Sequence, residues 1–111
     1  MSDLLHADQL RGHLAVVVGA GASGRAAARL LSRLGASVRF LEKNAKAVAD
    51  ALREEAAEAG YDLRLGAHGP ADFAGADMVV LSPGIRAAGL ADCLAACPGA
   101  QVLSELELAS W

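Results

Sequence analysis

The chain has 111 residues, of which 54% are hydrophobic, and its formal net charge is −3. This length predicts one domain with a real core, and the composition excludes a disordered chain. The slightly negative charge gives no reason to expect a nucleic acid partner, and no run approaches the roughly 18 apolar residues of a membrane span. Residues 1–13 form a polar lead-in without the basic and apolar regions of a secretory signal.

An apolar run at residues 14–18, LAVVV, is followed at once by a glycine-rich turn, Gly19–Gly24. Five apolar residues with three adjacent valines predict a strand buried on both faces. G-x-G-x-x-G between a strand and a helix is the dinucleotide-binding fingerprint. In it Gly19 allows a tight turn, Gly21 lets a phosphate approach the backbone, and Gly24 lets the helix pack closely. The alternative is a plain strand–turn–helix in which the glycines serve packing only.

Hydrophobic periodicity and turn residues predict the remaining elements. The helices are expected from the glycine turn to a C-cap at Gly35, over Ala45–Ala59 and over Arg86–Ala96. The further strands are expected at Ser37–Leu41, Tyr61–Leu65, Asp77–Leu81 and Gln101–Leu103. Ser104 then begins a last element, with Glu107 placed for a capping box. This alternation predicts one Rossmann-like, doubly wound α/β domain over residues 1–111, with a mostly parallel five-stranded sheet.

The remaining charged and sulfur-containing side chains suggest ordinary structural roles. The second predicted helix carries a charge run that we expect to be a solvated face: Lys46, Asp50, Arg53, Glu54, Glu55 and Glu58. Cys93 and Cys97 have no His or Cys at metal-ligand spacing, so we expect core or half-buried thiols and no metal site. Reduced thiols fit a cytoplasmic protein. His6 and His13 are interpreted as surface residues.

Two further positions could contact a ligand. Glu42 ends the second strand about 20 residues past the glycine turn, where a Rossmann acid takes the ribose hydroxyls. The alternative for Glu42 is a helix N-terminal acid favoured by the dipole. Ser82-Pro83-Gly84-Ile85 forms a turn at the carboxyl end of the fourth strand, the edge where such sheets bind ligands. No catalytic constellation and no P-loop is visible, so the residues alone predict a nucleotide-binding module without chemistry of its own.

Three stretches together, GAGASGRAAARLLSRLGASV, GADMVVLSPGI and VLSELELAS, resemble the amino-terminal domain of the Mur ligases. Within that family the resemblance is to the ligases that add D-glutamate, and it runs from about Leu14 to Ser110. The glycine turn is shared with many families. The Ser82–Ile85 turn, together with the later Glu105–Leu108, is much more specific.

The resemblance implies that the chain binds the UDP part of UDP-N-acetylmuramoyl-L-alanine. It implies that the diphosphate lies at Gly21, Ala22, Ser23 and Gly24. It also implies that the uridine lies between the end of the second strand and the turn after the fourth, near Glu42, Lys43, Asn44, Ser82 and Gly84. At the end of the second strand the family often has an aspartate, then a threonine or serine and an arginine, where this chain has Glu42, Lys43 and Asn44. The family also usually has a proline soon after the position of Ile85, and this chain lacks it.

The resemblance also implies a longer parent enzyme. In the family, a central domain binds ATP with Mg²⁺, a third domain closes over it, and the substrate carboxylate becomes an acyl phosphate that the amino group of D-glutamate attacks. This is peptidoglycan precursor synthesis in the cytoplasm. These domains would follow Trp111, so we expect a fragment that is inactive alone and has no cofactor of its own.

Two other classes of protein remain open. One is a nicotinamide-binding regulatory module, such as the domains that gate potassium transport, which share the glycine turn and the acid. The Ser82–Ile85 turn argues against it. The other is the NAD(P)-binding domain of a dehydrogenase, separated from its substrate domain.

Overall fold

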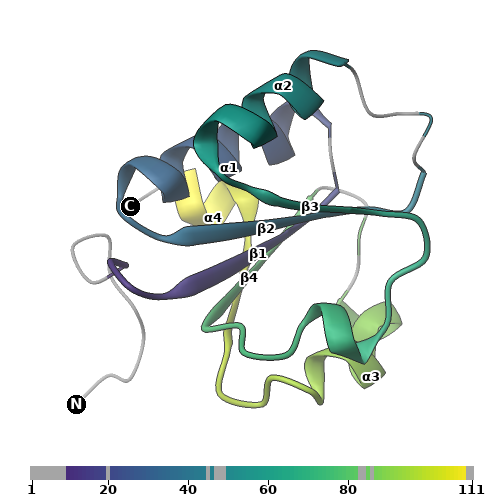
Figure 1. Cartoon of the computed structure of the whole chain (residues 1–111). Coiled ribbons are helices and arrows are strands. Elements are labelled where there is room, and N and C mark those ends of the chain that lie inside the picture. Colours follow the sequence, from purple (N-terminus) through teal and green to yellow (C-terminus); the bar gives the residue numbers. More distant parts are fainter. Residues whose placement is uncertain are drawn as a thin grey trace.

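A five-stranded parallel sheet forms the centre of the molecule (Figure 1). The computed structural model describes residues 10–19, 21–44, 46, 50–82, 85 and 87–109. The strands are β1 (Leu14–Val18), β2 (Ser37–Glu42), β3 (Asp62–Leu65), β4 (Met78–Leu81) and β5 (Gln101–Ser104), in the order β3-β2-β1-β4-β5. The predicted α/β architecture is confirmed. The described strands are all parallel, where the sequence predicted only a mostly parallel sheet.

Helices cover both faces of this sheet. Above it in Figure 1 lie α1 (Ala22–Arg33), α2 (Asp50–Ala59) and α4 (Glu105–Ala109); below it lie α3 (Ala91–Leu94) and the 3₁₀ turns η3 (Pro70–Asp72) and η4 (Ala87–Leu90). No described helix is long and apolar enough to cross a membrane.

The central strands are buried on both faces, which explains their continuous apolar sequence. Val17 of β1 and Val80 of β4 pack in the core under α1 and α2, while Val16 and Val79 pack in the core toward α3. All four side chains are fully buried. The strand boundaries lie within one residue of the predicted ones, because turn residues flank each apolar run.

Both predicted helix caps are confirmed. α1 ends where Gly35 adopts a φ of +98°, a conformation that glycine reaches without strain. At α4 the Ser104 N–H donates to Glu107 Oε1 at 3.0 Å, and the Glu107 N–H donates to Ser104 Oγ at 3.1 Å. These reciprocal bonds form the expected capping box.

The third predicted helix, Arg86–Ala96, is wrong as a continuous element. The described chain forms η4 and then only four helical residues, with a break at Leu90, where φ is −117° and ψ is 19°. Gly89, just before the break, weakens the helix. Leu90 and Leu94 still pack against the core, as predicted. The second helix begins at Asp50; residues 45 and 47–49 of its predicted range lie outside the described residues.

The two cysteines are free and buried, as the sequence predicted. Burial raises the pKa of the Cys93 thiol, and nearby Asp92 adds to the effect. Burial also raises the pKa of the Cys97 thiol. Both thiols therefore act as small apolar core groups, packed toward α3 with Phe73.

One acid of the predicted solvated face belongs instead to a helix–helix contact. Glu55 of α2 accepts two hydrogen bonds from Arg29 of α1, at 2.6 and 3.0 Å, and lies 3.5 Å from Arg25. Its side chain is only 21% exposed. The Arg29 guanidinium holds the pKa of Glu55 below its usual range. The sequence prediction for Glu55 is thus wrong, because a helix pattern alone does not show which neighbouring helix supplies a cation.

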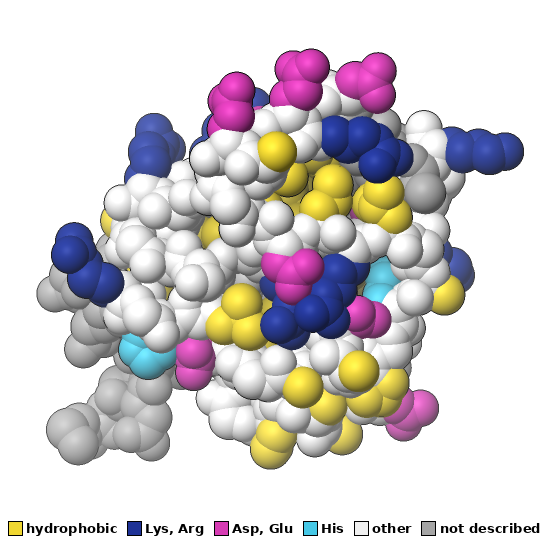
Figure 2. Space-filling view, viewed as in Figure 1, with side chains coloured by type: hydrophobic (Ala, Val, Ile, Leu, Met, Phe, Trp, Pro, Cys, Tyr) yellow, Lys and Arg dark blue, Asp and Glu magenta, His cyan; other side chains and the backbone are white. Residues whose placement is uncertain are grey.

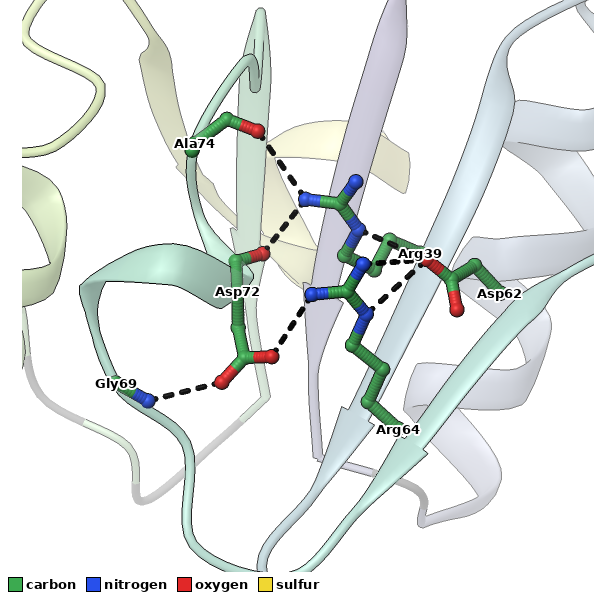
Figure 3. A network of polar contacts seen from close by, with 6 residues as sticks. All are labelled: Arg39, Asp62, Arg64, Gly69, Asp72 and Ala74. Atoms are coloured by element: carbon green, nitrogen blue, oxygen red, sulfur yellow. Dashed lines mark hydrogen bonds and ion pairs between the residues drawn. The ribbon is translucent and has the colours of Figure 1, made fainter.

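A polar network occupies the face of β2 and β3 on the side of α3 (Figure 3). Arg39 of β2 and Arg64 of β3 both bond Asp62 Oδ2, at 3.1 and 3.0 Å. Arg64 also bonds Asp72 of η3 at 2.9 Å, and Arg39 donates to the carbonyl oxygens of Asp72 and Ala74. Figure 2 shows basic and acidic side chains gathered in the middle of the side of the molecule that it draws. The network ties η3 to β2 and to the edge strand β3.

Candidate functional site

The predicted site residues that the structure describes come together at one edge of the sheet. The chain builds outward from β1 to β2 and β3, then crosses to β4 on the other side of β1. Such a reversal creates the switch point at which α/β sheets bind ligands. The glycine turn follows β1, Glu42 ends β2, and Ser82 follows β4. Three segments that are distant in sequence thus lie on adjacent strand ends.

Gly19 makes the sharp turn out of β1. Its φ is +103°, and an added Cβ would lie 2.5 Å from Ser82 Oγ. Its N–H donates to the Leu41 carbonyl of β2 at 2.8 Å. Both the backbone conformation and the close approach of Ser82 therefore require glycine here.

Gly24 and Gly21 have opposite surroundings. Gly24 is buried, and an added Cβ would overlap the Gly19 carbonyl oxygen. This confirms the predicted close packing of helix on turn. Gly21 is exposed, and nothing lies within 4 Å of where its Cβ would be. A ligand can approach the backbone at Gly21, and its role in binding a phosphate stays a prediction.

The start of α1 favours an anion. Gly21 is the N-cap, with φ −68° and ψ 178°, and the first turn holds no acidic residue. The first N–H groups of a helix lack intrahelical acceptors and carry the positive end of its dipole. Gly24 and the backbone of Ala22 and Ser23 form this turn; the side chains of Ala22 and Ser23 lie outside the described part of the structure. A phosphate group fits such a helix start.

At the end of β2, Glu42 organises its own loop. Its Oε2 accepts the Asn44 N–H at 2.9 Å, and Asn44 Oδ1 accepts the Lys46 N–H at 3.1 Å. Glu42 is half-buried, while Lys43 and Asn44 are exposed. Glu42 does not lie in the first turn of α2, which begins at Asp50 among the described residues. The exposed Lys43 and Asn44 can meet a ligand held at the glycine turn.

Ser82 joins the two sides of the switch point. Its N–H donates to the Val18 carbonyl at 3.1 Å, and its Oγ lies 3.2 Å from the Gly19 carbonyl oxygen. The same Oγ lies 2.8 Å from Oε1 of Glu105, a neighbour that the sequence prediction missed. The predicted ligand residue Gly84, like Pro83, lies outside the described residues, so its role stays a prediction.

The described residues at this edge include groups that can bind a ligand. They offer backbone N–H donors at the start of α1, the hydroxyl group of Ser82 and the exposed polar side chains of Lys43 and Asn44. Among them no group of three His, Cys, Asp or Glu side chains could hold a metal ion. The arrangement can therefore hold an anionic group against the helix start and polar groups beside it.

Comparison with known proteins assigns the fold to a broad family. The model of the "NAD(P)-binding Rossmann-like domain" family matches residues 17–78. The crystal structure of shikimate dehydrogenase from Aquifex aeolicus superposes with a TM-score of 0.55 at 15% identity. The superposition covers 92% of this chain and 46% of the dehydrogenase chain. At that identity the likeness shows the fold alone.

Sequence relatives are closer. The chain is 51% identical over 100 residues to the UDP-N-acetylmuramoylalanine–D-glutamate ligase of Nitratidesulfovibrio vulgaris (strain Miyazaki F), covering 89% of this chain and 22% of the ligase. It is 40% identical over 104 residues to the ligase of the same name from Salinibacter ruber, covering 94% of this chain and 22% of that protein. The chain thus spans 22% of the length of these two relatives.

Proposed function

We propose that this chain binds the UDP part of UDP-N-acetylmuramoyl-L-alanine. The chain belongs to the family of NAD(P)-binding Rossmann-like domains. It also matches the amino-terminal part of UDP-N-acetylmuramoylalanine–D-glutamate ligases. The diphosphate lies at the start of α1, along Gly21–Gly24. The uridine lies between Glu42–Asn44 and the turn that contains Ser82 and Gly84.

One observation supports the diphosphate site most directly. The glycine turn is closed where the fold needs packing, at Gly24, and open where a ligand would enter, at Gly21. A turn that served packing alone would not need a glycine at Gly21, because φ there is −68° and there is room for a side chain. A phosphate that contacts the backbone does need one.

The choice of uridine over a nicotinamide cofactor is supported by the sequence relatives. Identities of 40–51% link the chain to ligases whose name contains a UDP-sugar, whereas the dehydrogenase shares only the fold. An NAD(P)-binding module is the second candidate, and Glu42 favours it, because an acid in this place takes ribose hydroxyls in dinucleotide sites. In this fold Glu42 already accepts the Asn44 N–H, so it has a local structural role as well.

The proposal extends to the parent protein. The whole protein would be an ATP- and Mg²⁺-dependent ligase that joins D-glutamate to the substrate carboxylate by an amide bond, in cytoplasmic peptidoglycan synthesis, the pathway behind cell shape and division. Within it, the site described above would hold the nucleotide end of the substrate. The reacting carboxylate would lie beyond the sugar, away from the glycine turn.

A thermal-shift comparison tests the proposed ligand. A ligand that binds only the folded chain raises its melting temperature by mass action. We expect UDP-N-acetylmuramoyl-L-alanine, and UDP at higher concentration, to raise the melting temperature, while NAD and NADP at matched concentration leave it unchanged. Stabilisation by NAD, with none by any uridine nucleotide, would contradict the proposal and favour the regulatory module.

A further inference from the structure

Glu105 lies beside the candidate site because of the strand register. β4 and β5 are parallel neighbours, with Leu81 opposite Ser104. The next residue of each strand end, Ser82 and Glu105, therefore reaches the same edge of the sheet. Ser82 Oγ and Glu105 Oε1 are 2.8 Å apart. This contact joins the first residue of the Ser82–Ile85 turn to the first residue of Glu105–Leu108, the two stretches that are most specific in the family resemblance.

Ser82 in turn defines the shape of the glycine turn. Its Oγ lies 3.2 Å from the Gly19 carbonyl oxygen and occupies the space beside Gly19 where a side chain would stand. The same carbonyl oxygen fills the space left by the missing Cβ of Gly24. A shift of the Ser82 hydroxyl group would therefore move the Gly19 carbonyl, and with it the start of α1.

An acid in the first turn of α4, such as Glu105, is favoured by the helix dipole, but the capping of the helix does not require Glu105. The capping box of α4 is already complete with Ser104 and Glu107. Glu105 Oε2 is buried and has no hydrogen-bond partner among the described residues. A buried carboxylate oxygen without a donor costs free energy, so such an atom calls for a reason in the site that it borders.

We propose that Glu105 is a positioning residue of the diphosphate site, acting through Ser82 on the glycine turn. The inference rests on the proposed function. The Glu105 carboxylate accepts a hydrogen bond from the Ser82 hydroxyl group and so fixes the position of Ser82 Oγ beside Gly19. The turn is then held in the form that presents Gly21–Gly24 to the ligand, and Glu105 itself does not contact the ligand.

Variants of the 111-residue chain separate this role from a structural one. We expect Glu105→Ala and Ser82→Ala each to weaken binding of UDP-N-acetylmuramoyl-L-alanine about fivefold to tenfold, the worth of one hydrogen bond. Glu105→Gln keeps an acceptor for Ser82 and should stay within about twofold of the parent. The double variant should bind no more weakly than Ser82→Ala alone, because both changes remove one contact.

Glu107→Ala is the matched control. It removes an acid of the same helix whose side chain forms the capping box. We expect it to lower the melting temperature and leave ligand affinity unchanged. Equal affinity of Glu105→Ala and the parent, or a Glu107→Ala loss as large as that of Glu105→Ala, would overturn the inference while leaving the proposed function standing.

If the parent chain binds no uridine nucleotide, the proposed function is contradicted. A measurement without ligand then still tests whether Glu105 positions the glycine turn. Glu105→Ala and Ser82→Ala should then still move the backbone amide resonances of Gly19, Gly21 and Gly24, while Glu107→Ala leaves them in place. Unmoved resonances in Glu105→Ala would show that Glu105 does not hold the turn.

Discussion

Gly21 and Gly24 belong to the same turn, yet an added side chain would meet open space at one and the Gly19 carbonyl oxygen at the other. The first faces solvent at the start of α1, and the second is buried against the turn. The same residue type therefore serves ligand access in one place and packing in the other. Substitution at the two positions should separate binding from folding.

We predict that Gly24→Val lowers the free energy of unfolding by about 1–3 kcal/mol or more, as overpacking does. Gly21→Val should cost less stability and abolish ligand binding, because its side chain occupies the space of the phosphate. Urea unfolding and a ligand titration measure the two effects. Gly69→Val is a control, since Gly69 is also an extended N-cap with open space around it. Undiminished binding by Gly21→Val would show that the turn is structural only.

The sequence predicts the conformation of the glycine turn, but it does not predict the side-chain contacts that hold the turn in place. The fingerprint gives the separate roles of Gly19 and Gly24, because each spacing corresponds to one backbone requirement. It does not give the contact of Ser82 with Glu105, which depends on the register of β4 with β5. Register between parallel strands is set by packing across the whole sheet, and a single strand's sequence carries little of that information.

Among the elements, β2 and β3 depend on charged side chains that face η3. The Gly69 N–H and then the Arg64 guanidinium hold the pKa of Asp72 below its ordinary value of 3.8. Partial burial opposes the same shift at Asp62, but hydrogen bonds from Arg64 and Arg39 lower its pKa as well. Both carboxylates therefore bind the arginines more strongly when ionised.

This network predicts loss of stability in acid. Because the folded pKa of each acid lies below the unfolded value, the contribution is present above about pH 4 and is lost as the pH falls through the folded pKa. We expect the free energy of unfolding to fall as the pH drops below about 4, and less steeply in Asp62→Asn/Asp72→Asn. Glu55, with its lowered pKa, leaves some slope in that variant.

Urea unfolding at a series of pH values measures this slope. Glu58→Gln, at an exposed position of α2, is the control and should keep the parent's pH dependence. An acid slope in the double variant equal to that of the parent would show that the network contributes nothing to stability. The effect is modest, because Asp62 is 49% exposed and Asp72 22% exposed.

The elements that the sequence predicts correctly are those bounded by strong signals. Gly35 ends α1, and the capping box begins α4, because both signals act within a few residues. The region before α3 lacks such a signal: an alanine-rich stretch permits a helix without requiring one, and Gly89 interrupts it. The partners of Glu55 and Arg39 come from other elements, so no local pattern reveals them.

For the whole molecule, the proposal assigns this chain one part of a larger reaction. It spans 22% of the length of the two ligases compared above, and the proposal gives its described site the role of holding the nucleotide end of the substrate. We predict that the purified chain neither hydrolyses ATP nor forms an amide bond between D-glutamate and UDP-N-acetylmuramoyl-L-alanine. Phosphate release from ATP above the buffer background, proportional to the amount of chain, would contradict this.

The central claim is that the glycine turn holds the diphosphate of a uridine nucleotide. The most direct measurement is a titration of the ¹⁵N-labelled chain, followed by its backbone amide resonances, with UDP-N-acetylmuramoyl-L-alanine and separately with NAD. We predict saturable shifts at Gly21, Ser23, Gly24 and Asn44 with the uridine nucleotide, and none with NAD at the same concentrations. Shifts at these residues with NAD alone, and none with the uridine nucleotide, would contradict it.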